Sequence, residues 1–189
     1  MPNWCNFTMR ITGNPKGIAR VYNAATTDYN EEDADCPEHL WRVFDLEEVN
    51  EINYSRFLVS KDYIGDCAWS VYSCMFDGAY TYQNSNSKGH GITLQQLSKE
   101  ENLIIEVFSW EEGCAFSEHY LIVNGEVVID DTVDYYLLPC DLTVKELNKH
   151  SKHRWTRAKW DKYFEENEYY IVGGHSEDFC DHIKLLGGK

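Results

Sequence analysis

Two groups of histidine, cysteine and acidic residues in this sequence have side chains that could bind a metal ion. The pair His150 and His153 is spaced so that both rings share one face of a helix, but the surrounding lysines and arginines repel a cation. The second group has no further pair of ligands at the short spacing typical of a zinc site. It lies near the end of the sequence and contains His175, Asp178, Cys180, Asp181 and His182. We therefore predict no metal site and no cofactor.

One cysteine and one histidine have the chemistry of a nucleophile and its base. Cys114 and His119 could act in this way only if the fold brought the two side chains together. The sequence has no G-x-S-x-G, P-loop or G-x-G-x-x-G motif. The paired acids Glu111-Glu112 and Asp130-Asp131 fall at predicted turns, where such pairs are usually hydrated. We therefore predict that the protein is not an enzyme.

The acidic residues are concentrated in one segment. Ten acids and a single base, Arg42, lie between Asp28 and Glu51, in a chain whose net charge is -15. Such a surface repels phosphate and anionic lipid and attracts basic partners. The segment is either solvated surface or an imitation of a phosphate backbone, of the kind that a positively charged nuclease channel would bind. The predicted partner-binding residues are Glu31, Glu32, Asp33, Asp35, Glu38, Glu47, Glu48 and Glu51.

A basic segment supplies an alternative function, which is nucleic-acid binding. Seven of the seventeen lysines and arginines lie between Thr143 and Glu165. Aromatic side chains on a sheet could add a surface for base stacking, although the same residues are typical of a packed core and the net charge opposes this interpretation. The aromatic candidates are Trp69, Tyr72, Phe76, Tyr80 and Tyr82. The basic candidates are Lys149, Lys152, Arg154, Arg157 and Lys159.

Alternating apolar residues and turn signals predict the elements that would position these side chains. Strands are expected at 5–12, 67–76, 103–110 and 169–172, and the 67–76 strand is expected to be central. Asn14 and Pro15 predict a helix over 15–25. Asn124-Gly125 predicts a hairpin between 116–123 and 126–130. A capping box at Thr93/Gln96 predicts a short helix to residue 101, and a second one at Thr143/Glu146 predicts a long helix to residue 165. Residues 40–46 could form either a strand or a helix.

Cysteine usage and hydropathy suggest a location. The seven cysteines are an odd number without a C-x-x-C pair, which predicts free thiols in a reducing compartment. No apolar run has the roughly 20 residues that span a bilayer, and the first residues lack the features of a secretory signal. We expect no membrane association and a cytoplasmic location.

Two stretches resemble a known family. MPNWCNFTMRITG (residues 1–13) and LIIEVFSWEEGCAFSEHYLIVNGEVV (residues 103–128) are similar to the Api92-like, YubB-type proteins of phages and plasmids, whereas residues 62–72 depart from the family's Trp-rich central strand. The resemblance covers about residues 1–133. It implies an α+β, ferredoxin-like sandwich with an antiparallel sheet and helices on one face, and it implies no catalytic residues.

These observations predict two parts and one leading function. Residues 1–138 would form the ferredoxin-like domain, with the acidic insertion near 28–51, and residues 139–189 would form a C-terminal appendage of basic helix and tail. The leading hypothesis is a non-enzymatic phage or mobile-element accessory protein in the host cytoplasm. It would bind and inhibit a basic host protein, such as a CRISPR effector or another defence nuclease, by acting as an acidic mimic of nucleic acid. The sequence does not determine the oligomeric state.

Overall fold

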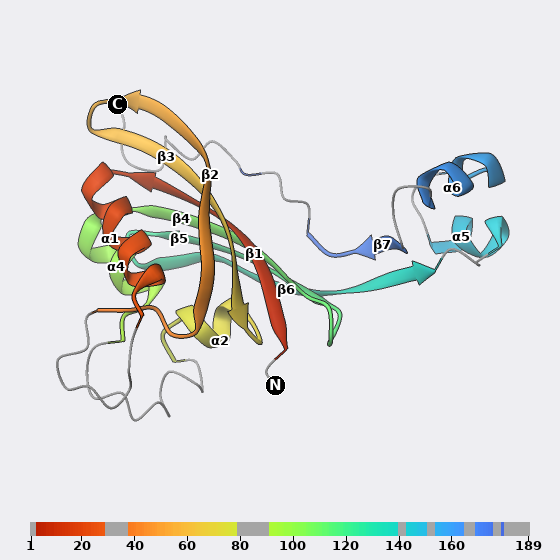
Figure 1. Ribbon diagram of the computed structural model, residues 1–189, viewed down its shortest axis with the longest axis horizontal. Helices are drawn as coiled ribbons and strands as arrows, with labels where there is room; N and C mark the ends of the chain where they lie inside the picture. The colour runs from red at the N-terminus through yellow and green to blue at the C-terminus, as the bar shows by residue number, and fades with distance from the viewer. Residues whose placement is uncertain are drawn as a thin grey trace.

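The strands of the computed structural model form one mainly antiparallel arrangement, in the order β2-β3-β1-β4-β5-β6-β7 (Figure 1). The structure describes residues 3–28, 38–78, 91–139, 143–150, 154–164, 169–175 and 179. Every strand pair between neighbours is antiparallel. The strands are β1 (Trp4–Gly13), β2 (Val43–Ser55), β3 (Leu58–Ala68), β4 (Ile104–Glu111), β5 (Phe116–Val123), β6 (Glu126–Pro139) and β7 (Tyr169–Gly173).

The helices that lie between β1 and β4 in the chain pack on one face of this sheet and enclose the core. The described helices are α1 (Pro15–Thr26), α2 (Val71–Met75), α4 (Leu94–Glu101), α5 (Val144–His150) and α6 (Arg157–Phe164). Alternate residues of β1 are buried in this core: Cys5, Phe7, Met9 and Ile11. The other residues of β1 lie on the opposite face, here called the polar face, which carries Asn6, Thr8 and Arg10. The predicted α+β class is confirmed, and the sheet is larger than that of a ferredoxin-like sandwich.

Local signals in the sequence position most of these elements correctly. Asn14 caps α1, since its side-chain oxygen accepts a hydrogen bond of 2.7 Å from the Gly17 amide. Thr93 and Gln96 form the predicted capping box of α4. Asn124 and Gly125 have φ of 51° and 88°, which matches the turn predicted between β5 and β6. The ambiguous segment 40–46 contributes the start of β2 rather than a helix.

The prediction of a central strand over residues 67–76 is wrong. β3 ends at Ala68, Trp69 takes a left-handed φ of 69°, and α2 begins at Val71. The buried carboxylate of Glu118 on β5 accepts hydrogen bonds from the amides of Val71 and Tyr72, at 2.9 and 3.4 Å. A helix N-terminus facing a carboxylate is favourable, and this partner, 47 residues away, turns an apolar run into a helix.

The predicted long helix from Thr143 to Glu165 is also wrong, because two shorter helices replace it. α5 ends at His150, and residues 154–156 are not helical. The side chain of Asn148 accepts from the Trp155 amide at 2.6 Å and donates to the Trp155 carbonyl at 3.0 Å. Asparagine competes in this way with helical backbone bonds, so the chain turns before α6 begins. Trp160 is buried and packs edge-to-face against Trp155, 5.1 Å away between ring centroids.

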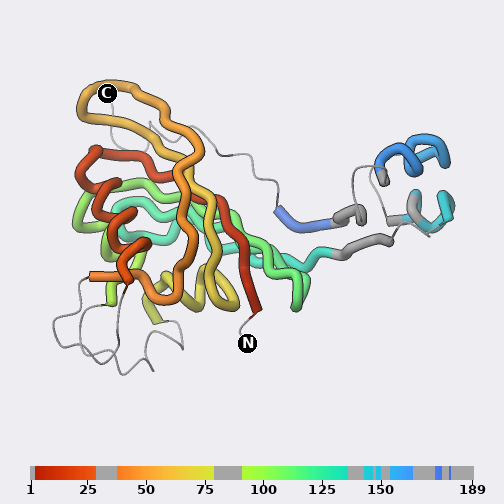
Figure 2. Tube along the Cα trace, in the orientation of Figure 1, coloured from red at the N-terminus to blue at the C-terminus, as the bar shows by residue number. Residues whose placement is uncertain are grey.

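The last part of β6 leaves the main sheet and forms a two-stranded ribbon with β7. Tyr135 to Pro139 pair with Gly173 to Tyr169, across the point where we predicted the domain boundary. α5 and α6 follow at the far end of this ribbon, away from α1 and α4 (Figure 2). No helix in the described ranges is both long and apolar enough to cross a membrane.

Candidate functional site

The predicted partner-binding acids do not form one surface in the described structure. Glu31, Glu32, Asp33 and Asp35 lie outside the described residues. Glu38 forms an ion pair of 2.7 Å with Arg20, which also pairs with Glu100 and Glu101. Successive residues of β2 point to opposite faces, so Glu47 lies on the polar face and Glu48 on the helix side.

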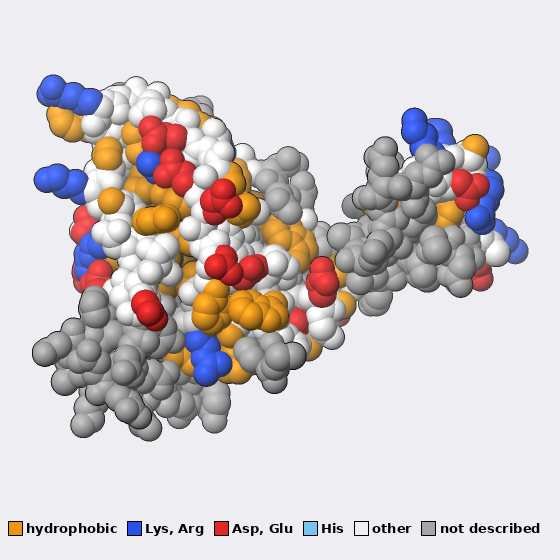
Figure 3. Space-filling view, in the orientation of Figure 1, with side chains coloured by type: hydrophobic (Ala, Val, Ile, Leu, Met, Phe, Trp, Pro, Cys, Tyr) orange, Lys and Arg blue, Asp and Glu red, His pale blue; other side chains and the backbone are white. Residues whose placement is uncertain are grey.

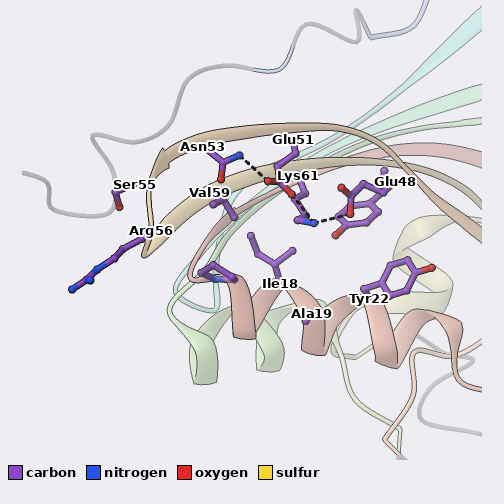
Figure 4. Close-up of a pocket in the computed structure, with 12 residues that line it drawn as sticks. Ile18, Ala19, Tyr22, Glu48, Glu51, Asn53, Ser55, Arg56, Val59 and Lys61 are labelled. Carbon is purple, nitrogen blue, oxygen red and sulfur yellow. Dashed lines mark hydrogen bonds and ion pairs between the residues drawn. The ribbon is translucent and has the colours of Figure 1, made fainter.

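Glu48 and Glu51 line a groove between α1 and the β2–β3 hairpin (Figure 4). Both carboxylates point at Lys61, and each lies 2.8 Å from its Nζ atom. Their hydrogen bonds raise the pKa of Lys61, and the bond from Lys61 lowers the pKa of Glu51. Tyr63 forms part of the groove wall, and its burial raises its pKa to about 12. Two of the predicted acids therefore share one cation, which neutralises one of their two negative charges.

A second groove, on the polar face, collects carboxylates that have no such cation. We call it the acidic groove; its volume is about 340 Å³. It carries three carboxylates, from Asp45 and Glu47 on β2 and Asp66 on β3. Asp66 accepts a hydrogen bond from the Asn6 side chain, and no described lysine or arginine forms an ion pair with any of the three. The lining residues are Asn6, Phe7, Thr8, Asp45, Glu47, Ile64, Gly65, Asp66 and Trp110.

A β-bulge places two of these carboxylates in the groove. Phe44 pairs with Asp66 and Glu47 with Ile64, so two residues of β2 lie opposite Gly65 alone. Asp45 takes a φ of 50° within this bulge, a conformation that aspartate tolerates better than most residues. A Cβ on Gly65 would lie 2.8 Å from Phe7 Cζ and 3.2 Å from Leu46 Cδ1. The glycine therefore lets Leu46 pack inward while Asp45 and Glu47 stay in the groove.

Exposed apolar side chains lie beside the acidic groove. Trp4 is 53% exposed and Phe44 is 37% exposed, and the two rings meet edge-to-face with centroids 5.2 Å apart. Ile64 is 42% exposed on the groove wall. On the face of the molecule that Figure 3 shows, acidic and hydrophobic side chains lie next to one another. Aromatic side chains are enriched at protein-binding surfaces.

Backbone strain is concentrated next to these aromatic side chains. Arg42 and Trp69 have φ of 49° and 69°, in addition to Asp45 in the bulge. The Arg42 guanidinium lies over the rings of Trp41 and Trp69, 4.6 and 5.0 Å from their centroids. Left-handed conformations of bulky residues are costly and cluster at functional sites. The other described non-glycine residues with positive φ lie at a helix end or in turns, where such conformations are common: Asn102, Ala115 and Asn124.

The alternative nucleic-acid-binding residues are only partly described. Lys149 is exposed on α5, and Arg154 is exposed between the helices. Lys159 and Arg157 are exposed on α6, where Arg157 pairs with Asp161 at 2.8 Å. Lys152 lies outside the described residues. Of the aromatic candidates, Trp69 follows β3, Tyr72 lies on α2, and Phe76 is buried directly after the end of α2. Tyr80 and Tyr82 lie outside the described residues.

The possible catalytic residues have other partners. Cys114 lies in the exposed turn between β4 and β5, where the carboxylate of Glu111 raises its pKa. A raised pKa lowers the thiolate fraction on which a cysteine nucleophile depends. His119 stacks on Phe108 and lies 3.0 Å, from Nε2 to Oε1, from Glu106.

The possible metal ligands are not brought together in the described part of the chain. Among the described residues, no three histidine, cysteine or acidic side chains are arranged to hold a metal ion. Of the candidate ligands near the end of the sequence, only His175 is described, and it lies near His119 with the ring centroids 5.5 Å apart.

Sequence reasoning missed most of the acidic groove. It selected Glu47 but not Asp45, Asp66, Asn6 or Trp110. Asn6 and Thr8 could have been assigned to one face from the alternation in β1, whereas the bulge at Asp45 has no clear signal in the sequence. No family model, no curated protein and no solved structure matches the chain, so the groove is interpreted from its own residues.

Proposed function

We propose that this is a non-enzymatic binding protein that docks a basic partner protein in the acidic groove. The observation that carries the proposal is the set of three carboxylates without an ion-pair partner in the described structure, beside the exposed rings of Trp4 and Phe44. A net charge of -15 would steer a cationic partner toward the molecule. The aromatic side chains would contribute contact area that charge alone does not give.

The partner class that fits best is a host nuclease with a positively charged nucleic-acid channel. The proposed protein is a phage or mobile-element accessory factor that acts in the host cytoplasm, and a CRISPR effector is a target of the required kind. The negative charge and the family resemblance support this proposal. The order β2-β3-β1-β4, with helices after β1 and β3, supports a ferredoxin-like unit that β5 and β6 extend.

The chain offers a matched pair of variants for the test. Glu47→Gln with Asp66→Asn removes two charges from the acidic groove. Glu48→Gln with Glu51→Gln removes two charges from the groove between α1 and the β2–β3 hairpin. Binding to a panel of defence nucleases would be measured at two salt concentrations. We expect binding that weakens with salt and is reduced by the first double variant but not by the second. Equal loss in both would show that only net charge matters, and the absence of binding would refute the proposal.

Nucleic-acid binding by the basic helices is the second candidate. The exposed basic residues of this part of the chain are Lys149 on α5, Arg154 between the two helices and Lys159 on α6. The β6–β7 ribbon connects the two helices to the main sheet. Gel shifts with duplex DNA and single-stranded RNA at low and moderate salt would test it, because phosphate binding weakens steeply as salt rises. Loss of the shift in Lys149→Gln with Lys159→Gln would support this second function.

A further inference from the structure

We propose that the acidic groove is selective for an arginine side chain of the partner, in preference to lysine. This inference rests on the proposed function and specifies the chemical group that the groove recognises. It follows from a comparison of two rows of side chains that cross the polar face of the same sheet.

The first row already contains an arginine. Arg10 donates from Nε and Nη2 to the two carboxylate oxygens of Asp62, at 2.6 and 2.8 Å, and Asn50 also donates to Asp62. The guanidinium lies 4.8 Å from the ring centroid of Phe179, so it is bound by a carboxylate and faces an aromatic ring. In sheet order the row is Asn50, Asp62, Arg10 and Glu106.

The second row has the same carboxylate but lacks the arginine. Asp66 lies four residues after Asp62 on β3, and Asn6 lies four residues before Arg10 on β1, so both pairs share the polar face. In sheet order this row is Phe44, Asp66, Asn6 and Trp110. Asparagine is shorter than arginine and has no charge, and the acidic groove lies at this position. A guanidinium from outside would therefore complete the second row as Arg10 completes the first.

The groove also offers more hydrogen-bond acceptors than one ammonium group needs. Asp45, Glu47 and Asp66 approach from two strands, and the buried Oγ1 atom of Thr8 has no hydrogen-bond partner among the described residues. An arginine has five N–H donors in a planar fork, whereas lysine is a compact and strongly hydrated point charge. Trp110 supplies an aromatic wall on which a weakly hydrated guanidinium can stack. These features favour the planar group over a point charge.

Two synthetic peptides that differ only in having arginine or lysine at every basic position would test the inference. Calorimetric titration at low salt is expected to give about tenfold tighter binding of the arginine peptide, which corresponds to one additional charged hydrogen bond. Asn6→Arg should place the chain's own guanidinium against Asp66 and abolish this preference. Asn6→Gln is the matched control and should keep it. Circular dichroism and thermal unfolding would verify that both variants fold.

The outcomes separate this inference from the proposed function. Equal affinity for the two peptides, with both weakened by Glu47→Gln and Asp66→Asn, would overturn the arginine preference and leave the basic-partner proposal standing. An arginine preference that persists in Asn6→Arg would place the preference elsewhere and overturn the inference. If neither peptide binds at low salt, both proposals fail.

Discussion

The carboxylate of Glu118, buried on β5, accepts a hydrogen bond of 2.9 Å from the backbone amide of Val71 at the start of α2. The same side chain accepts from Ser109 Oγ at 2.6 Å and from the Tyr120 hydroxyl at 3.2 Å. Burial raises the pKa of Glu118, and these donors act against the rise. One acidic side chain thus joins β4, β5 and α2.

Replacing Glu118 with alanine should therefore destabilise the protein. The variant leaves the Val71 amide and the Ser109 hydroxyl buried without their acceptor, and we expect a loss of about 1–3 kcal/mol in the free energy of unfolding. Urea titration followed by circular dichroism would measure the loss. The exposed neighbour Glu112→Ala is the control and should change little. A loss no greater than in this control would contradict the assigned role.

The pair Arg10 and Asp62 should make stability depend on acid. Burial raises the pKa of Asp62, but the hydrogen bonds from Arg10 and Asn50 outweigh it, so this pKa lies below its ordinary value. The folded state thus binds this proton less readily than the unfolded state, and the stabilisation is complete above the unfolded pKa and is lost as pH falls through the folded one. Asp62→Asn should flatten this acid-side decline. Urea midpoints of the unchanged protein and of Asp62→Asn would be measured between pH 7 and pH 2. If both proteins lose stability equally steeply as pH falls, the expectation is wrong.

Gly65→Ala should disturb the β-bulge beside the acidic groove. The added methyl group would meet Phe7 Cζ at 2.8 Å, and overpacking of this kind costs about 1–3 kcal/mol. Thermal unfolding would measure the effect. Phe7→Leu removes the clashing atom. Gly65→Ala should therefore cost less stability when it is added to Phe7→Leu than when it is added to the unchanged protein. Purely additive losses would show that the clash does not occur.

Cysteine alkylation should distinguish the exposed thiol from the buried ones. Cys5, Cys67 and Cys74 are buried, and burial raises the pKa of Cys67 well above its ordinary value. Cys114 is exposed, although Glu111 raises its pKa as well. Under native conditions iodoacetamide should modify Cys114 before these three, as measured by mass spectrometry of peptides. Modification of Cys67 before Cys114 would contradict the burial of the Cys67 side chain.

The sequence predicts elements whose signals are local and misses those that depend on distant partners. Alternation defines β1, and caps next to the helix define α1 and α4. The apolar run 67–76 alone predicts a strand, because the hydrogen bond from the Val71 amide to Glu118 spans 47 positions of the chain and leaves no local signal. The spacing of apolar residues alone predicts one long basic helix. It does not predict the hydrogen bond to the Asn148 side chain from the amide of Trp155, which lies between the two helices.

The candidate site shows the same division. The charged run predicts Glu47 as a binding residue, yet its neighbours Glu48 and Glu51 face the other side of the sheet and share Lys61. The groove depends on how β1, β3 and β4 align with β2, and on the bulge at Asp45. Strand register and bulges depend on tertiary packing, so the charge pattern supports the proposal of a basic partner but does not predict the position of the groove.

The place of β2 at the end of the sheet bears on how copies of the protein meet. One side of its backbone has no neighbour among the described strands, and such edges invite pairing between molecules. Glu47, Glu48 and Glu51 line this strand, so two copies brought edge to edge would set like charges against each other. The acids along β2 therefore oppose pairing of two copies of the protein through this edge.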